Sequence, residues 1–315
     1  MKKQILVYLE SENGRLAKAS LEALHAAELL RDQTGYQVSA VITDDAAAET
    51  AGAYGADGVI AVSPAEYQPE RCARTLAALF EKYGAVTLVL GATRDGKELA
   101  ARTAAQLHIG CISDAIDLTD EGWQRAVYGG ALRETVSYED RYVVSVRAGT
   151  FGRPAMRPDP SAVPVTAEQV SDTPLRVVIR EAVREMTEEV NLEDAEIIVA
   201  GGRGMGNAEN FKLVEELAQA LDGVVGASRP AIEEGWASRN RQVGQSGKMV
   251  APKLYIACGI SGAMQHVSGM AGSGCIVAIN KDEDAPIFDI ADVGIVGNVT
   301  EVLPLLIEEV RARKS

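Results

Sequence analysis

The chain has 315 residues, of which 47% are hydrophobic and 24% charged, the balance of a globular protein rather than a disordered one. Its length fits two domains, because a domain commonly contains about 150 residues. The formal net charge of −14 argues against DNA or RNA as a partner, since phosphate backbones are bound by basic surfaces.

The first residues and the cysteines favour a cytoplasmic protein. The apolar run that begins at Ile5 is short and is closed by Glu10 and Glu12, which is typical of a first strand and not of a signal peptide. No run of about 18 apolar residues is present, so no membrane-embedded helix is expected. The four cysteines and three histidines are scattered. This scatter predicts a reducing compartment, no disulfide and no metal site.

Short apolar runs alternate with helical periodicity over the first third of the chain. We predict strands at residues 4–9, 37–42, 58–62 and 85–90, which are rich in β-branched side chains. We predict helices over residues 15–31, 69–82 and 94–107, where apolar side chains recur every three or four positions. Strands that alternate with helices predict an α/β fold with a parallel sheet, here a nucleotide-binding-like N-terminal domain.

The middle of the chain does not continue the alternation of strands and helices. Residues 111–150 contain strand-like segments separated by polar breaks, which suggests antiparallel strands added to the first sheet. Five of the eleven prolines then lie between Pro154 and Pro174, and such a run cannot continue a helix or a central strand. A linker and an extended arm on a neighbouring chain both fit this run. We therefore predict an N-terminal domain over 1–153, a connecting segment over 154–190 and a C-terminal domain over 191–315.

The C-terminal domain repeats the alternation of strands and helices and is rich in glycine. We predict strands at residues 195–200, 253–259, 275–280 and 293–297, with helices from about 208 to 221 and from about 299 to 312. Of the 30 glycines, 16 lie between Gly201 and Gly297, and they cluster directly after strands. Because open α/β sheets bind ligands at that edge, we expect a Rossmann-like domain with a binding site there.

One glycine-rich stretch, QVGQSGK at residues 242–248, partly matches a P-loop. A P-loop needs a glycine where this chain has Gln242 and a hydroxyl where it has Met249. Pro252 follows too closely for the helix that a P-loop requires. The stretch therefore predicts no nucleotide hydrolysis.

A second stretch, GGRGMG, falls short of a dinucleotide-binding fingerprint. Gly202 and Gly204 would require a third Gly or Ala where Asn207 stands. An NAD(P)-dependent dehydrogenase is thus one alternative, although it lacks the fingerprint and a catalytic acid/base cluster. A nucleotide-binding regulatory protein of the universal-stress type is another, suggested by residues 1–110, but it leaves the C-terminal motifs unexplained.

Six C-terminal motifs together resemble the alpha subunit of electron-transfer flavoproteins. In chain order they are AGGRGMG, VGASRPAIEEGW, QVGQSGK, PKLYIACGISGAMQH, IVAINKDEDAPIF and ADVGIVGN. The resemblance is specific from about residue 195 to 312 and is mainly one of layout over 1–150. It implies a C-terminal domain that binds FAD and an N-terminal domain that packs against a separate beta subunit in a heterodimer.

The resemblance also implies a function. Such a heterodimer passes electrons from acyl-CoA or other dehydrogenases, or from NADH, to an acceptor such as a quinone reductase. FAD carries the chemistry, so we expect no catalytic residue and an electron carrier rather than a stand-alone enzyme. The sequence leaves open whether the complex is electron-bifurcating, because a second FAD would lie in the beta subunit.

The resemblance further implies the contacts to FAD. The Ser246 hydroxyl is expected near flavin N5, and a partly or fully protonated His266 near the C2 carbonyl would stabilise an anionic semiquinone. Arg203 is expected at the phosphates or the flavin edge, and Asn280 and Asn298 near the adenosine. The expected set is Arg203, Ser228, Arg229, Gln242, Val243, Gly244, Gln245, Ser246, Ser261, Gly262, Ala263, Met264, Gln265, His266, Asn280 and Asn298.

Overall fold

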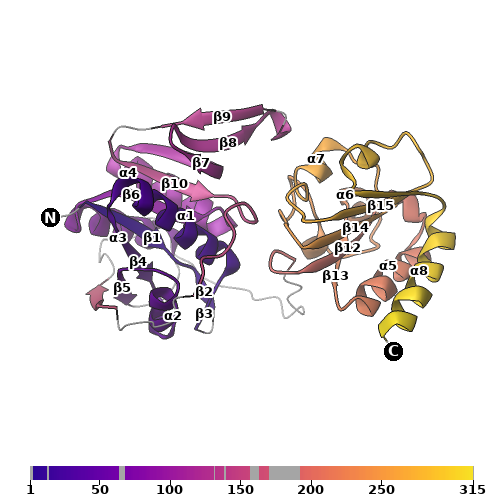
Figure 1. Cartoon of the computed structure of the whole chain (residues 1–315), viewed down its shortest axis with the longest axis horizontal. Coiled ribbons are helices and arrows are strands. Elements are labelled where there is room, and N and C mark those ends of the chain that lie inside the picture. The colour runs from indigo at the N-terminus through magenta and orange to yellow at the C-terminus, as the bar shows by residue number, and fades with distance from the viewer. Residues whose placement is uncertain are drawn as a thin grey trace. The chain divides into compact units, whose positions relative to one another are not determined.

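A computed structural model describes residues 3–12, 14–63, 68–130, 132–137, 140–156, 163–169 and 192–314. The chain divides into two compact units, Met1–Arg184 and Glu185–Ser315, and each contains its own sheet (Figure 1). The predicted α/β fold class is confirmed, because the first sheet is mostly parallel and the second entirely so. The predicted domain boundaries stay predictions, since residues 157–162 and 170–191 lie outside the described residues.

The first unit is built around a nine-stranded sheet with the strand order β11-β5-β4-β1-β6-β10-β7-β8-β9. Its strands are β1 (Gln4–Tyr8), β4 (Gln37–Ile42), β5 (Gly58–Ser63), β6 (Ala85–Gly91), β7 (Gly110–Thr119), β8 (Gly122–Val127), β9 (Leu132–Val136), β10 (Tyr142–Val146) and β11 (Val165–Gln169). Its helices are α1 (Lys18–Thr34), α2 (Ala48–Ala53), α3 (Pro69–Lys82) and α4 (Arg94–Leu107). The helix predicted from residue 15 begins only at Lys18, because β3 (Arg15–Leu16) pairs with β2 (Ser11–Glu12) in a separate hairpin.

The strands predicted to be antiparallel are so only in part. β8 pairs with β7, and β9 with β8, in antiparallel fashion as expected. β10 is instead parallel to both of its neighbours, β6 and β7, so the prediction was wrong for residues 142–146. All five residues of β10 are buried, as is usual for a strand inside a parallel sheet that is covered on both faces.

A strand also lies within the segment predicted to be a linker or an arm. β11 pairs in parallel with β5 and forms one edge of the sheet. It follows Pro164, whose carbonyl accepts a hydrogen bond from the N–H of Val59. An edge position suits this sequence, because a proline cannot donate to a second neighbouring strand. Residues 165–169 therefore belong to this chain's own sheet.

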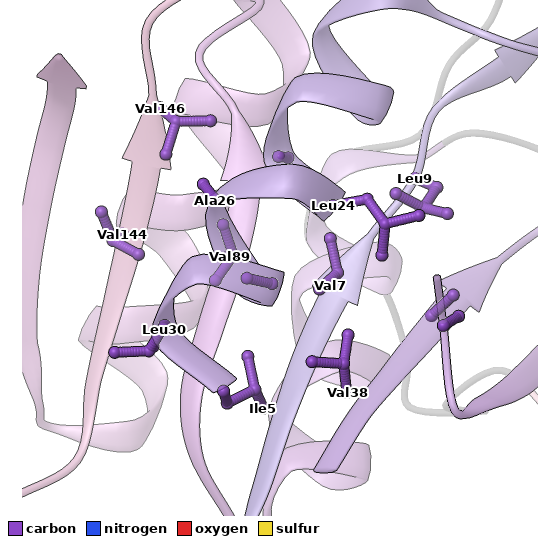
Figure 2. Packing of buried hydrophobic residues seen from close by; sticks show 14 of the residues in the cluster. Ile5, Val7, Leu9, Leu24, Ala26, Leu30, Val38, Val89, Val144 and Val146 are labelled. Carbon is purple, nitrogen blue, oxygen red and sulfur yellow. The ribbon is translucent and has the colours of Figure 1, made fainter. Parts of the chain in front are cut away.

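The two faces of the first sheet have separate hydrophobic cores. Along β1, Ile5 and Val7 lie in the cluster with α1, whereas Leu6 and Tyr8 lie in the cluster with α3 and α4. Figure 2 shows Leu24 of α1 beside Val7 of β1. Successive side chains of a strand point to opposite faces. Burial on both faces is therefore why the strand reads as a continuous apolar run.

The second unit is a five-stranded parallel sheet with the strand order β13-β12-β14-β15-β16. Its strands are β12 (Ile197–Gly201), β13 (Val224–Ala227), β14 (Leu254–Cys258), β15 (Ile276–Asn280) and β16 (Val293–Val296). Its helices are α5 (Ala208–Ala220), α6 (Arg229–Glu233), α7 (Met264–Val267) and α8 (Val299–Lys314). The apolar faces of α5 and α8 pack against the sheet through Leu217 and Leu303. This packing anchors the strands, whose carboxyl ends carry the loops described below.

Candidate functional site

The loops at the carboxyl ends of the second sheet enclose a cavity. β12 lies between β13 and β14, so the chain continues from β12 to one side of the sheet and later returns to the other. A crevice opens at such a switch point, and open α/β sheets bind their ligands there. The cavity has a volume of about 890 Å³, and its lining follows the ends of β12, β13, β14 and β15. This volume is within the usual range of small-molecule and cofactor sites.

Two glycine-rich turns contact each other backbone to backbone at this edge. The N–H of Gly204 donates to the carbonyl of Gly259 at 2.9 Å, and the N–H of Gly202 donates to the carbonyl of Cys258 at 2.8 Å. A Cβ at Gly259 would lie 2.7 Å from the backbone of Gly204, and Gly259 has a φ of 61°. Glycine is needed there for both the close approach and the left-handed conformation. Gly204 and Gly259 both line the cavity.

Ser228 places a buried hydroxyl at the cavity. It is the N-cap residue of α6, yet its side chain caps no N–H group. Ser228 is 6% exposed, and its Oγ has no hydrogen-bond partner among the described residues. Its N–H, in contrast, donates to the carbonyl of Gly201 at 3.0 Å. Buried polar groups in folded proteins nearly always have a partner, so this hydroxyl indicates a group that a ligand satisfies.

The loop from Gln242 to Lys248 folds back on itself beside α7. The N–H of Lys248 donates to the carbonyl of Gln242 at 2.8 Å, and the N–H of Gln245 donates to the carbonyl of Gln265 at 2.7 Å. The Gln242 amide donates to Ser246 Oγ at 2.9 Å, which leaves the hydroxyl proton of Ser246 to donate elsewhere. The next regular element is the strand β14 and not a helix, so the loop lacks the arrangement of a P-loop.

His266 of α7 lies at the cavity in a neutral form. The side chain is 7% exposed, and its Nε2 is 2.9 Å from the hydroxyl of Tyr255. Burial lowers the pKa of His266 to about 4, while the backbone of Val243 acts weakly in the opposite direction. The ligand-free fold thus favours the neutral ring at neutral pH, and the partly or fully protonated His266 expected beside a reduced flavin stays a prediction. The reason is burial, which removes water from the imidazolium and penalises its charge.

The charges around the cavity are mostly positive. Arg203, Arg229 and Lys281 line it together with the single carboxylate of Asp282. Arg229 is already paired with Glu233 at 2.8 Å. Among the described residues, no ion pair involves Arg203 or Lys281. These two cations can therefore bind an anionic ligand without first breaking an ion pair.

The two asparagines expected near the adenosine have structural roles. Asn280 donates to the carbonyl of Ile260 at 2.9 Å and accepts from the N–H of Asp282 at 3.0 Å, so it braces the turn after β15. Asn298 precedes α8, and its Oδ1 accepts from the N–H of Thr300 at 3.2 Å. Asn280 lines the cavity, whereas Asn298 does not. A contact from Asn298 to a ligand stays a prediction.

Most of the residues expected from the sequence meet at this one cavity. Those that line it are Arg203, Ser228, Arg229, Gln242, Val243, Gly244, Gln245, Ser246, Ser261, Ala263, Gln265, His266 and Asn280. Gly262, Met264 and Asn298 are not among the lining residues; Gly262 instead contacts the backbone of Ile287. The lining residues missed from the sequence are Gly204, Pro230, Gly259, Ile260, Lys281, Asp282, Ala285 and Pro286. Their position in the chain could have identified them, because most of them directly follow a strand or an already predicted contact.

The lining offers binding groups rather than a nucleophile with its base. The Ser228 hydroxyl has no partner, that of Ser246 is bonded to an amide, and His266 is bonded to Tyr255. Within the described part of the chain, no group of three or more His, Cys, Asp or Glu side chains could hold a metal. The arrangement therefore favours a bound organic ligand with anionic groups.

The burial of His266 predicts an acid-sensitive second unit. The folded pKa is about 4 and the unfolded value about 6.5, so the unfolded chain takes up the proton first as the pH falls. The contribution of the neutral, buried His266 to the free energy of unfolding is fully present above the unfolded pKa and declines below it. We expect a loss of about 2 kcal/mol between about pH 7 and about pH 5 from this residue alone.

Urea unfolding of the flavin-free heterodimer at the two pH values measures this loss. A His266→Gln variant is the control, because Gln can accept a hydrogen bond from Tyr255 but does not titrate. The unfolding midpoint of the variant should depend less on pH than that of the natural chain. Equal pH dependence in the two proteins would contradict a buried neutral His266.

No helix in the described ranges is long and apolar enough to cross a membrane.

Comparisons with known proteins agree with the geometry. The electron transfer flavoprotein FAD-binding domain matches residues 191–271, and the electron transfer flavoprotein domain matches residues 5–173. The chain is 40% identical to the electron transfer flavoprotein subunit alpha of Thermoanaerobacterium thermosaccharolyticum over 99% of both chains. It is 39% identical to that of Megasphaera elsdenii over 99% of this chain and 97% of the relative. It is 38% identical to that of Bacillus subtilis over 98% of both.

Proposed function

This chain belongs to the electron transfer flavoprotein alpha-subunit family, and on that premise we propose that it is the FAD-binding half of a heterodimer with a beta subunit. The heterodimer accepts electrons from acyl-CoA or other flavin dehydrogenases, or from NADH in an electron-bifurcating complex. It delivers them to a downstream acceptor such as a quinone reductase. Four cysteines without a disulfide support the proposal of a reducing, cytoplasmic location.

The cavity fits FAD in its unused polar atoms, and this is the observation that supports the proposal most. Ser228 Oγ and His266 Nδ1 are both buried and without a hydrogen-bond partner among the described residues. Both residues line the same cavity. Two such orphaned atoms in one cavity are costly unless a ligand with several polar atoms satisfies them. A flavin ring edge and a pyrophosphate offer such atoms.

The positively charged residues of the cavity suit the phosphates of FAD, whereas its uncharged residues suit the flavin ring. We assign the phosphates to Arg203, whose guanidinium forks onto anionic oxygens, and to Ser228. Lys281 extends the positive charge to the turn after β15, where Asn280 braces the expected adenosine end.

The Gln242–Lys248 loop and His266 are assigned to the flavin ring. When bound, FAD supplies the chemistry of electron uptake and release. Ser246 presents a hydroxyl proton to the ring, and His266 presents its free nitrogen. The loop is held against α7 by the hydrogen bond between Gln245 and Gln265. The chain thus binds, orients and partly shields the ring while carrying no reacting group of its own.

The experiment that tests the proposal is co-expression with the beta subunit encoded by the same organism. We expect a yellow complex with one alpha and one beta chain that releases FAD and not FMN from this subunit. The chain expressed alone should be poorly soluble or lose its FAD, because a partner subunit covers part of the electron-transfer surface. Absorption spectra, chromatography of the released flavin and light scattering measure these outcomes. A colourless complex that does not take up added FAD refutes the proposal.

A further inference from the structure

Tyr255 and His266 form an isolated polar pair inside the second unit. Tyr255 is in β14 and is fully buried, and His266 is in α7. The Tyr255 hydroxyl is 2.9 Å from His266 Nε2, and the two ring planes are inclined at 60°. Among the described residues, the hydroxyl has no other hydrogen-bond partner. The contact is therefore the one place where the polar end of Tyr255 is satisfied.

The strengths of the two possible acceptors decide which of the two groups donates. Both groups keep their neutral forms at neutral pH, because burial raises the pKa of Tyr255 well above its usual value and lowers that of His266 to about 4. If His266 donated from Nε2, the phenol proton would have no acceptor and Nδ1 would be a buried lone pair without a donor. If Tyr255 donates to Nε2, the phenol proton and the Nε2 lone pair are both used, and the unmet groups are the Nδ1 proton and a lone pair of the phenol oxygen. Each arrangement leaves one proton and one lone pair unmet, but the second is favoured, because an imidazole nitrogen is a stronger hydrogen-bond acceptor than a phenol oxygen and the phenol is the more acidic donor.

We propose that Tyr255 is a positioning residue that holds His266 as a neutral ring with its proton on Nδ1. The nitrogen left for the ligand is then a hydrogen-bond donor without a positive charge. It is suited to a neutral acceptor, such as a carbonyl oxygen of a flavin ring, more than to a phosphate. This assignment rests on the proposed FAD site, because that site makes the flavin the ligand that His266 meets.

The backbone of Val243 is consistent with this tautomer. It favours a protonated ring nitrogen of His266, as a carbonyl acceptor does. Val243 also lines the cavity. In the absence of a ligand, no described group accepts a hydrogen bond from Nδ1. A ligand carbonyl in the cavity offers the better acceptor, and Tyr255 holds the ring ready to donate to it.

The tautomer can be read directly from the natural protein. The alpha chain is labelled with ¹⁵N-histidine and assembled with an unlabelled beta subunit, so that only His25, His108 and His266 give signals. We expect the ¹⁵N spectrum at neutral pH to show a protonated Nδ1 and an unprotonated Nε2 for His266, with and without FAD. His266→Gln identifies the signal. An Nε2-protonated ring or an imidazolium overturns the proposal.

Two variants test whether Tyr255 is the cause. Tyr255→Phe removes the donor and keeps the ring, so the His266 nitrogen shifts should move toward a mixture of tautomers. FAD should bind about 3-fold to 10-fold more weakly, the effect of losing one neutral hydrogen bond. Tyr142→Phe is the matched control, because its hydroxyl accepts a buried hydrogen bond from Trp123 in the first unit. This control should change neither the nitrogen shifts of His266 nor the affinity for FAD.

The outcomes separate this proposal from the proposed function. Unchanged His266 shifts in Tyr255→Phe overturn the role of Tyr255 even when the complex binds FAD normally. A natural complex that binds no FAD refutes the proposed function, while its histidine spectrum still reports the tautomer. If Tyr255→Phe does not fold, the spectrum of the natural protein alone decides.

Discussion

Gly259→Ala is expected to abolish retention of FAD and to destabilise the second unit by more than about 2 kcal/mol. The new Cβ would lie 2.7 Å from the backbone of Gly204, and no flexible side chain is there to move aside. Alanine is also strained at the φ of 61° that residue 259 adopts. Relief of the contact must separate the two turns that line the cavity, so the site and the fold are damaged together. The flavin-to-protein absorbance ratio and the urea midpoint of the heterodimer measure the two effects.

Gly272→Ala is the matched control for this substitution. Gly272 is exposed in the same unit, and a Cβ there would meet only the Cβ of Ala251, at an ordinary distance of 3.5 Å. It should retain FAD and lose little stability. A Gly259→Ala protein with full flavin content would show that the contact between the two turns is not needed for the site.

Arg203→Ala is expected to weaken the binding of FAD by between about 10-fold and about 100-fold, the effect of losing a charge-assisted hydrogen bond. Arg203 is exposed at the cavity, and no described carboxylate forms an ion pair with it. Its full charge is therefore available to the phosphates. Arg203→Lys should recover part of the affinity, because lysine keeps the charge but loses the forked geometry. Fluorescence titration of the flavin-free heterodimer with FAD gives the affinities.

Arg239→Ala controls for the change of one positive charge in the second unit. Arg239 is exposed and does not line the cavity. It should bind FAD much more tightly than Arg203→Ala does at moderate salt, because its side chain does not line the cavity and an exposed charge there is screened. If Arg239→Ala and Arg203→Ala weaken FAD equally, the effect comes from overall charge, and the assignment of Arg203 to the phosphates is wrong.

Elements with a strong local pattern could be predicted from the sequence. The strands that begin at Gln4 and Ala85 are mainly apolar and contain β-branched residues, and the helix over residues 94–107 keeps its period. β13 was missed, because its four residues, VVGA, are too short for a period to show. The direction of β10 was also missed, because the residues of a strand do not determine which strands lie beside it or whether they run parallel to it.

The sequence by itself determined the α/β class, the family resemblance and most of the residues at the cavity. Glycine, hydroxyl, amide and arginine side chains recur after successive strands, and parallel strands bring their carboxyl ends to one edge. Only the tertiary structure decided the protonation and the hydrogen-bond partners of those groups. The pKa of His266 depends on how much water the fold removes from the ring. Whether the Ser228 hydroxyl has a hydrogen-bond partner depends on which N–H groups the fold places near it. Burial and hydrogen-bond partners are set by residues distant in the chain, such as Tyr255 for His266, so no local pattern could show them.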